Sequence, residues 1–212
     1  MKTLFYGVEN PDVFLIQPVD SHDMEVMDSE FANIEAHCQK KVRLAAVLVD
    51  DWNKDLSPWE APPVFGKEGF GAGAAETLSY IENNVLSELL GEKDIPIILG
   101  GYSLAGLFAL WSVYQTDRFA ACAAASPSVW FPGWIDYAAE HAPKTKALYL
   151  SLGDREKKAR NPLMATVADC IVRQNDLLGD LPHTLEWNPG NHFIDSDIRT
   201  AKGFVWAIEQ IQ

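Results

Sequence analysis

The sequence of 212 residues contains little positive charge, few cysteines and no long apolar run. Its 17 lysines and arginines stand against 30 aspartates and glutamates, a net charge of −13, which argues against nucleic acid or an anionic membrane surface as a partner. No stretch stays apolar over the roughly 20 residues that a membrane span requires. The N-terminus also lacks the unbroken apolar region of a signal peptide.

Cysteine occurs only at Cys38, Cys122 and Cys170. An odd number of scattered cysteines is typical of reduced thiols, so we expect a cytoplasmic location. Their spacing matches no metal site, so none is predicted. Packing in the core is therefore the expected role of all three side chains.

Apolar segments with the length of strands alternate with helical patterns along the chain. The strand patterns cover residues 4–7, 13–19, 42–49, 95–99, 119–125, 147–152 and 183–187. The helical patterns cover residues 24–38, 74–90, the stretch after 106, 133–141, 161–178 and the chain from 197 onward. This alternation predicts an α/β fold with a mainly parallel sheet. With 48% hydrophobic residues and no sign of a linker, residues 1–212 are expected to form one domain.

A serine lies between a predicted strand and a predicted helix, in the segment 100–106 (GGYSLAG). Strand, small-residue turn and helix together are the context of a nucleophile elbow. Strand and helix approach each other closely there, so only small residues fit two positions before and after Ser103, and these are Gly101 and Ala105. A phosphate-binding loop fits worse, because no Lys-Ser or Lys-Thr pair follows the glycines. The remaining alternative is a glycine-rich turn with an incidental serine.

Three histidines follow Ser103 along the chain, and one of them is placed to activate it. A serine hydroxyl is a weak nucleophile until a base takes its proton. His141 falls at a predicted helix end and His183 precedes a strand. His192 follows the last strand in a loop rich in glycine, asparagine and proline, at the edge where it can fold back over Ser103. We therefore predict His192 as the base, with a structural histidine as the alternative.

Two carboxylates compete to orient His192. Asp154 and Glu156 both follow the strand pattern 147–152, and the next strand pattern, 183–187, leads to His192. Either could accept the Nδ1–H of His192 and leave Nε2 free for Ser103. Glu156 is narrowly preferred because it lies three residues beyond Gly153, a common spacing for this acid. The alternative is that this charged turn is a solvated surface with salt bridges.

Backbone N–H groups are expected to stabilise the oxyanion in such a site. One donor should be the N–H of Leu104, directly after the serine. The second should come from the loop after the strand pattern 42–49, at Asp51 or Trp52. This assignment depends on topology alone, since backbone donors leave almost no trace in a sequence.

A long segment over residues 50–73, rich in proline, glycine and aromatics, is expected to form part of the binding pocket. A loop of this length is usually functional, and ligands of such sheets bind beyond the carboxyl ends of the strands. The alternative is that its aromatic side chains only attach the loop to the surface. Ser126 and Ser128 follow the strand pattern 119–125, and for them the alternative to lining the pocket is capping the next turn. The expected substrate-binding residues are Trp59, Phe65, Phe70, Ser126 and Trp130.

Four segments carry a resemblance to a known family: residues 100–111 (GGYSLAGLFALW), 124–131 (AASPSVWF), 150–161 (LSLGDREKKARN) and 190–193 (GNHF). With them the chain resembles the α/β-hydrolase superfamily, and within it the esterases akin to esterase D and the ferric enterobactin esterases. The resemblance implies an α/β-hydrolase fold without a large lid domain. It also implies Ser103 as nucleophile, His192 as base and an acid in the turn 153–156.

The activity that this resemblance implies is cleavage of a carboxylic ester of a small molecule, without a cofactor. An acyltransferase or thioesterase would use the same residues, and a binding protein with this fold could lack catalysis altogether. The sequence does not predict the oligomeric state or the identity of the ester.

Overall fold

A seven-stranded sheet forms the centre of the computed structural model, which describes residues 1–64, 66–90 and 94–211. The strand order is β1-β3-β2-β4-β5-β6-β7. β1 runs antiparallel to β3, and every other neighbouring pair is parallel, which confirms the predicted mainly parallel sheet. The strands are β1 (Lys2–Gly7), β2 (Val13–Val19), β3 (Val42–Leu48), β4 (Ile97–Tyr102), β5 (Ala121–Ala125), β6 (Ala147–Gly153) and β7 (His183–Asn188).

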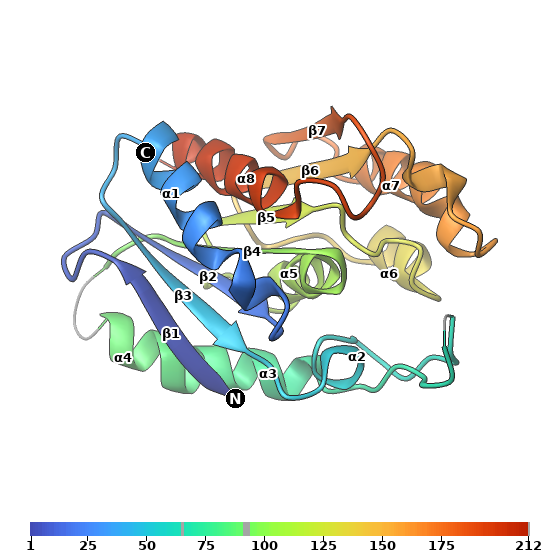
Figure 1. The fold of residues 1–212 in the computed structure, drawn as a ribbon, viewed down its shortest axis with the longest axis horizontal. Coiled ribbons are helices and arrows are strands. Elements are labelled where there is room, and N and C mark those ends of the chain that lie inside the picture. Colours follow the sequence, from blue (N-terminus) through green and yellow to red (C-terminus); the bar gives the residue numbers. More distant parts are fainter. Residues whose placement is uncertain (65, 91–93, 212) are drawn as a thin grey trace.

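Helices cover both faces of the sheet, so its central strands are buried and apolar (Figure 1). One face packs against α1 (Met27–His37) and α8 (Ser196–Gln210). The other face packs against the remaining helices. These are α3 (Ala74–Tyr80), α4 (Leu86–Leu90), α5 (Ser103–Gln115), α6 (Trp134–Glu140) and α7 (Val167–Asp176), with the short α2 (Trp52–Asp55) at one end.

The helix that precedes β4 is interrupted, whereas its pattern predicts a continuous helix over residues 74–90. Between α3 and α4 the chain forms one π-helical turn over Ile81–Val85. Both Ile81 and Val85 remain buried in the core through this turn. The local change of hydrogen bonding therefore keeps the apolar face of the segment on the sheet.

The segment 50–73 has more structure than its composition indicates. It begins with α2, whose first turn is capped by the Asp51 carboxylate, 3.0 Å from the N–H of Lys54. Farther on, Ala61 and Phe70 form an isolated antiparallel bridge with two backbone hydrogen bonds. These contacts fold the segment back on itself at the carboxyl end of β3.

Within the described residues, no helix is both long enough and apolar enough to cross a membrane. In the same part of the chain no three side chains of the metal-binding types gather around a common point. The three cysteines are free thiols. Cys122 is buried in β5, and this burial raises the pKa of its thiol, which keeps it protonated.

Glu30 is a carboxyl group buried between α1 and β2. Gln17 donates to its Oε2 at 3.3 Å, and only 2% of the residue is exposed. Burial raises the pKa of Glu30 well above its ordinary value. The folded protein therefore holds this proton more tightly than the unfolded chain, and the free energy of unfolding falls as the pH rises above the unfolded pKa of about 4.3, until the folded pKa is passed.

Replacing Glu30 by glutamine should remove this pH dependence, because the amide has the same shape and no charge. We expect Glu30→Gln to be more stable than the natural protein at pH 8 by on the order of 1–2 kcal/mol, since the slope is about 1.4 kcal/mol per pH unit between the two pKa values. Urea denaturation at pH 5 and pH 8 measures the difference. Glu35→Gln, at an exposed position of the same helix, is the matched control. Parallel pH curves for Glu30→Gln and the natural protein would contradict the assignment.

Candidate active site

Ser103 lies at the junction of β4 and α5 in a strained backbone conformation. Its φ is 58°, in the left-handed region that non-glycine residues rarely adopt. A Cβ atom added at Gly101 would lie 2.7 Å from the Cβ of Ala105, so strand and helix approach too closely for a larger residue. The N–H of Ser128 donates to the Ser103 carbonyl at 3.0 Å and helps to hold the turn. This is the geometry of a nucleophile elbow.

His192 lies in the loop after β7 and reaches back to this elbow. Its Nε2 is 2.9 Å from Ser103 Oγ, and its Nδ1 is 2.8 Å from Glu156 Oε2. The imidazole can therefore keep a proton on Nδ1 and accept the serine proton on Nε2. About 23% of its side chain is exposed, which leaves one side of the ring open to a substrate.

The carboxylate of Glu156 divides its two oxygens between different partners. Oε2 faces His192, whereas Oε1 accepts from the N–H of Gly153 at 2.7 Å and from Ser126 Oγ at 2.8 Å. A third donor to Oε1 is Nη1 of Arg199, at 3.3 Å. Because only 4% of the Glu156 side chain is exposed, these contacts determine its orientation.

Asp154, the other candidate acid, points away from His192. Its Oδ1 accepts the N–H of Gly190 at 2.9 Å, and 56% of its side chain is exposed. After β6 the chain enters a 3-10 turn over Glu156–Lys158, which directs the Glu156 side chain inward and leaves Asp154 on the outside. The structure thus brings Glu156 to the histidine, and Asp154 instead ties the histidine loop to the end of β6.

The two other histidines downstream of Ser103 have separate surroundings. The ring of His141 stacks on Tyr137 with centroids 4.1 Å apart, and its Nδ1 lies 2.8 Å from the Tyr137 carbonyl. His183 Nδ1 lies 2.6 Å from the carbonyl of Leu181, at the start of β7. Both rings therefore contact backbone groups close to them in the chain, and neither lines the cavity beside Ser103.

A cavity of about 500 Å³ opens beside Ser103 and His192. Aromatic and other apolar side chains dominate its walls, and Arg160 brings a positive charge to them. Phe193 is 88% exposed and packs edge-on against the His192 ring at 5.6 Å, so it stands at the mouth. The apolar walls come from Trp52, Phe70, Trp130, Met164 and Phe193.

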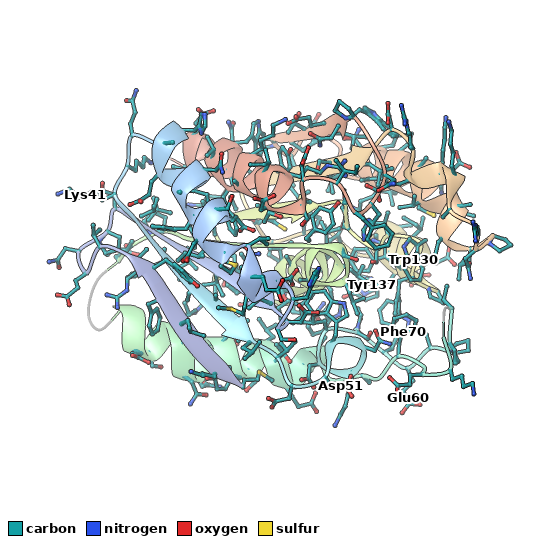
Figure 2. All side chains as sticks on the ribbon, in the orientation of Figure 1. Lys41, Asp51, Glu60, Phe70, Trp130 and Tyr137 are labelled. Carbon is teal, nitrogen blue, oxygen red and sulfur yellow. The ribbon has the colours of Figure 1, made fainter. Side chains whose placement is uncertain are left out.

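Two of the predicted substrate-binding residues line this cavity. Phe70 and Trp130 pack edge to face with ring centroids 6.2 Å apart. Figure 2 shows both side chains at the same end of the molecule, beyond the carboxyl ends of the parallel strands. The segment 50–73 and the loop after β5 thus supply adjacent parts of one wall.

Trp59 and Ser126, two further predicted substrate-binding residues, are not among the residues that line this cavity. Trp59 donates from Nε1 to the Pro132 carbonyl at 2.8 Å and packs edge-on against Phe131, so it attaches the long loop to α6. Ser126 is fully buried behind the site, where its hydroxyl donates to Glu156. Phe65 lies outside the described residues.

The two candidates for the second oxyanion donor differ in their hydrogen bonding. The N–H of Asp51 already donates to Asp55 Oδ2 at 3.0 Å, so it is not available to a ligand. Trp52 and Leu104 both line the cavity. Leu104 lies in the first turn of α5, where backbone N–H groups have no acceptor within the helix.

Ser128, one of the two serines that the sequence analysis notes after the strand pattern 119–125, has its Oγ 3.5 Å from that of Ser103 and lines the cavity. Two other residues of the site escape the sequence analysis. Arg199 is buried in the first turn of α8, where a single arginine in a helical pattern reads as a surface residue. Tyr102 donates to the His192 carbonyl at 2.8 Å, and nothing in its position before the serine indicates this contact.

Known proteins match this chain in structure and not in sequence. No protein-family model matches the chain, and no curated protein sequence matches it significantly. The siderophore hydrolase EstA of Aspergillus nidulans superimposes with a TM-score of 0.68 at 21% identity, over 94% of this chain and 83% of that one. An IroE-like serine hydrolase of Shewanella oneidensis gives 0.70 at 17% identity, over 93% and 69%.

The enterobactin esterase of Shigella flexneri has a TM-score of 0.69 at 12% identity, over 99% of this chain and 56% of that longer one. The parallel sheet, the elbow after β4 and these structural neighbours all indicate the same fold. The described residues form no large lid over the cavity. This chain therefore has the α/β-hydrolase fold, as do the siderophore and enterobactin esterases that it resembles.

Proposed function

We propose that this protein is a serine esterase that cleaves a carboxylic ester of a small molecule through an acyl-enzyme on Ser103. The observation that carries the proposal is the unbroken series of hydrogen bonds from Ser103 Oγ to His192 at 2.9 Å and from His192 to Glu156 at 2.8 Å. This series lies beside an apolar cavity on an α/β-hydrolase fold. Nucleophile, acid and base (Ser103, Glu156 and His192) follow in the chain order of that fold.

In the first half of the reaction, Ser103 Oγ attacks the ester carbonyl while His192 Nε2 takes its proton. Glu156 holds the Nδ1–H and stabilises the imidazolium that forms. The oxyanion of the tetrahedral intermediate accepts from the N–H groups of Leu104 and Trp52. His192 then gives its proton to the departing alcohol, which leaves the acyl group on Ser103.

In the second half, water repeats these steps on the acyl-enzyme. His192 Nε2 takes a proton from the water as it attacks the acyl carbonyl, and returns it to Ser103 Oγ as the acid leaves. All of these roles fall to side chains and backbone groups of this chain. The proposed mechanism therefore calls on no metal and no cofactor.

The cavity suggests the kind of ester. Its volume of about 500 Å³ and its apolar walls suit an acyl or aryl group of modest size. Two neighbours are named for action on siderophores and on enterobactin. We infer that this site takes a small ester or the protruding ester end of a larger molecule.

A fluorophosphonate probe tests the proposal directly, because it reacts with a serine whose proton is accepted by a neighbouring base. We expect one probe per chain, mapped to Ser103 by mass spectrometry, and hydrolysis of p-nitrophenyl esters from acetate to octanoate. The heat-unfolded protein is the control and should not react. A folded protein that neither reacts with the probe nor hydrolyses any ester would favour a non-catalytic binding role.

The assignment of the acid predicts different results for two neighbouring carboxylates. Glu156→Gln should lower kcat by about 10³-fold, because the amide no longer stabilises the imidazolium and can present an N–H to Nδ1. Asp154→Asn should stay within about fivefold of the natural protein, since its amide oxygen can still accept the N–H of Gly190. Steady-state kinetics on one ester measures both. The reverse order of effects would move the role to Asp154.

A further inference from the structure

Arg199 is a buried arginine in α8 that contacts three separate parts of the site. Its side chain is 2% exposed. Nη1 lies 3.1 Å from Tyr102 Oη and 3.3 Å from Glu156 Oε1, and Nη2 donates to the Pro189 carbonyl at 2.9 Å. α8 thus connects the strand end before the nucleophile, the acid and the loop that carries the histidine.

Tyr102 extends this network to the histidine itself. Its hydroxyl accepts from Arg199 and donates to the His192 carbonyl at 2.8 Å. Burial raises the pKa of Tyr102 to about 12, so the hydroxyl stays protonated and remains a donor at any working pH. Since Tyr102 directly precedes Ser103, this hydrogen bond connects the loop of His192 to the nucleophile elbow.

The charges of the network balance only when Arg199 is present. A buried carboxylate loses its hydration and requires a compensating charge or strong donors. The other donors to Glu156 Oε1 are neutral, namely the N–H of Gly153 and the hydroxyl of Ser126. Arg199 is the cation that faces this oxygen, and it leaves Oε2 directed at His192.

We propose that Arg199 is a positioning residue of the esterase reaction, which orients the Glu156 carboxylate and fixes the loop of His192 through Pro189 and Tyr102. This inference rests on the proposed function. It assigns Arg199 no contact with the substrate. Its replacement should therefore lower kcat and leave KM nearly unchanged.

The test compares Arg199→Met with Arg199→Lys. We expect Arg199→Met to lower kcat by about 10²-fold with KM within about threefold. Arg199→Lys keeps the charge but loses the planar fork, so it should restore only part of kcat. Arg173→Met, at an exposed position of α7, is the control and should behave as the natural protein.

A measurement that needs no turnover separates this inference from the proposed function. The Nδ1 proton of His192, held by Glu156, should give a downfield proton NMR signal in the natural protein and lose it in Arg199→Met. If the natural protein shows the signal, Arg199→Met loses it and no ester is cleaved, the proposed function fails while the positioning of Glu156 and His192 by Arg199 stands. A folded Arg199→Met variant with natural kcat and signal would overturn the inference. If Arg199→Met does not fold, Arg199→Lys and Tyr102→Phe decide it, and natural values in both would also overturn it.

Discussion

Ser103→Ala is expected to lose ester hydrolysis by about 10⁵-fold and to take up no fluorophosphonate. Its Oγ is the hydroxyl 2.9 Å from His192 Nε2, and the strained φ of 58° directs it out of the sheet. Alanine removes the nucleophile but leaves the backbone donors and the cavity in place. The residual rate should therefore come from oxyanion stabilisation and substrate binding alone.

Ser128→Ala is the informative partner of this experiment. The Ser128 hydroxyl lies 3.5 Å from that of Ser103 and also lines the cavity. We expect this variant to retain stoichiometric labelling at Ser103, with the site mapped by mass spectrometry and folding checked by circular dichroism. Labelling that persists in Ser103→Ala and disappears in Ser128→Ala would assign the nucleophile to Ser128 instead.

His192→Ala should lower kcat by about 10⁴-fold with little change in KM. Without the imidazole, the proton of Ser103 has no acceptor at Nε2, and the negative charge of Glu156 no longer reaches the reacting atoms. Reaction with the fluorophosphonate should slow by a similar factor, because the probe also requires an activated serine. Steady-state kinetics and the rate of labelling measure the two effects independently.

The other histidines provide matched controls for this variant. His141 stacks on Tyr137, and His183 contacts the Leu181 carbonyl, so neither takes part in the proposed reaction. We expect His141→Ala and His183→Ala to stay within about threefold of the natural kcat. Losses of equal size in all three variants would contradict His192 as the base and indicate a general effect on folding.

Local patterns in the sequence predict the framework of the site. The alternation of apolar strands and helices predicts the mainly parallel sheet, and the sheet is observed. The small residues around Ser103 predict a close approach of strand and helix, and a Cβ at Gly101 would indeed lie 2.7 Å from Ala105. These features depend on residues near one another in the chain. Periodicity and residue size are therefore enough to predict them.

Such patterns do not predict which of Glu156 and Asp154 faces His192. Both follow β6, and sequence spacing separates them only narrowly. The 3-10 turn after Arg155 directs Glu156 inward and leaves Asp154 exposed, which depends on the path of the backbone. Gly153 permits this path, because a Cβ there would lie 2.6 Å from the Gly190 carbonyl oxygen of a different loop.

The sequence also does not predict which aromatic residues of the segment 50–73 face the cavity. Phe70 lines the cavity, whereas Trp59 turns toward α6 and bonds to Pro132. Composition predicts that such a segment is important, but the direction of each ring depends on which helix lies beneath it. Here the Trp59 ring packs on Tyr137 of α6, whereas the Phe70 ring packs on Trp130 beside the cavity.

By itself, the sequence determined the order of strands and helices, the elbow at Ser103 and the placing of His192 beyond the last strand. Only the tertiary structure decided which carboxylate meets the histidine, that the Asp51 N–H is already bonded to Asp55, and that Arg199 enters the site from α8. The physical reason is that the first set depends on short-range periodicity and residue size. The second set depends on loops from distant strands meeting at one edge of the sheet, where side-chain directions follow from packing across the whole fold.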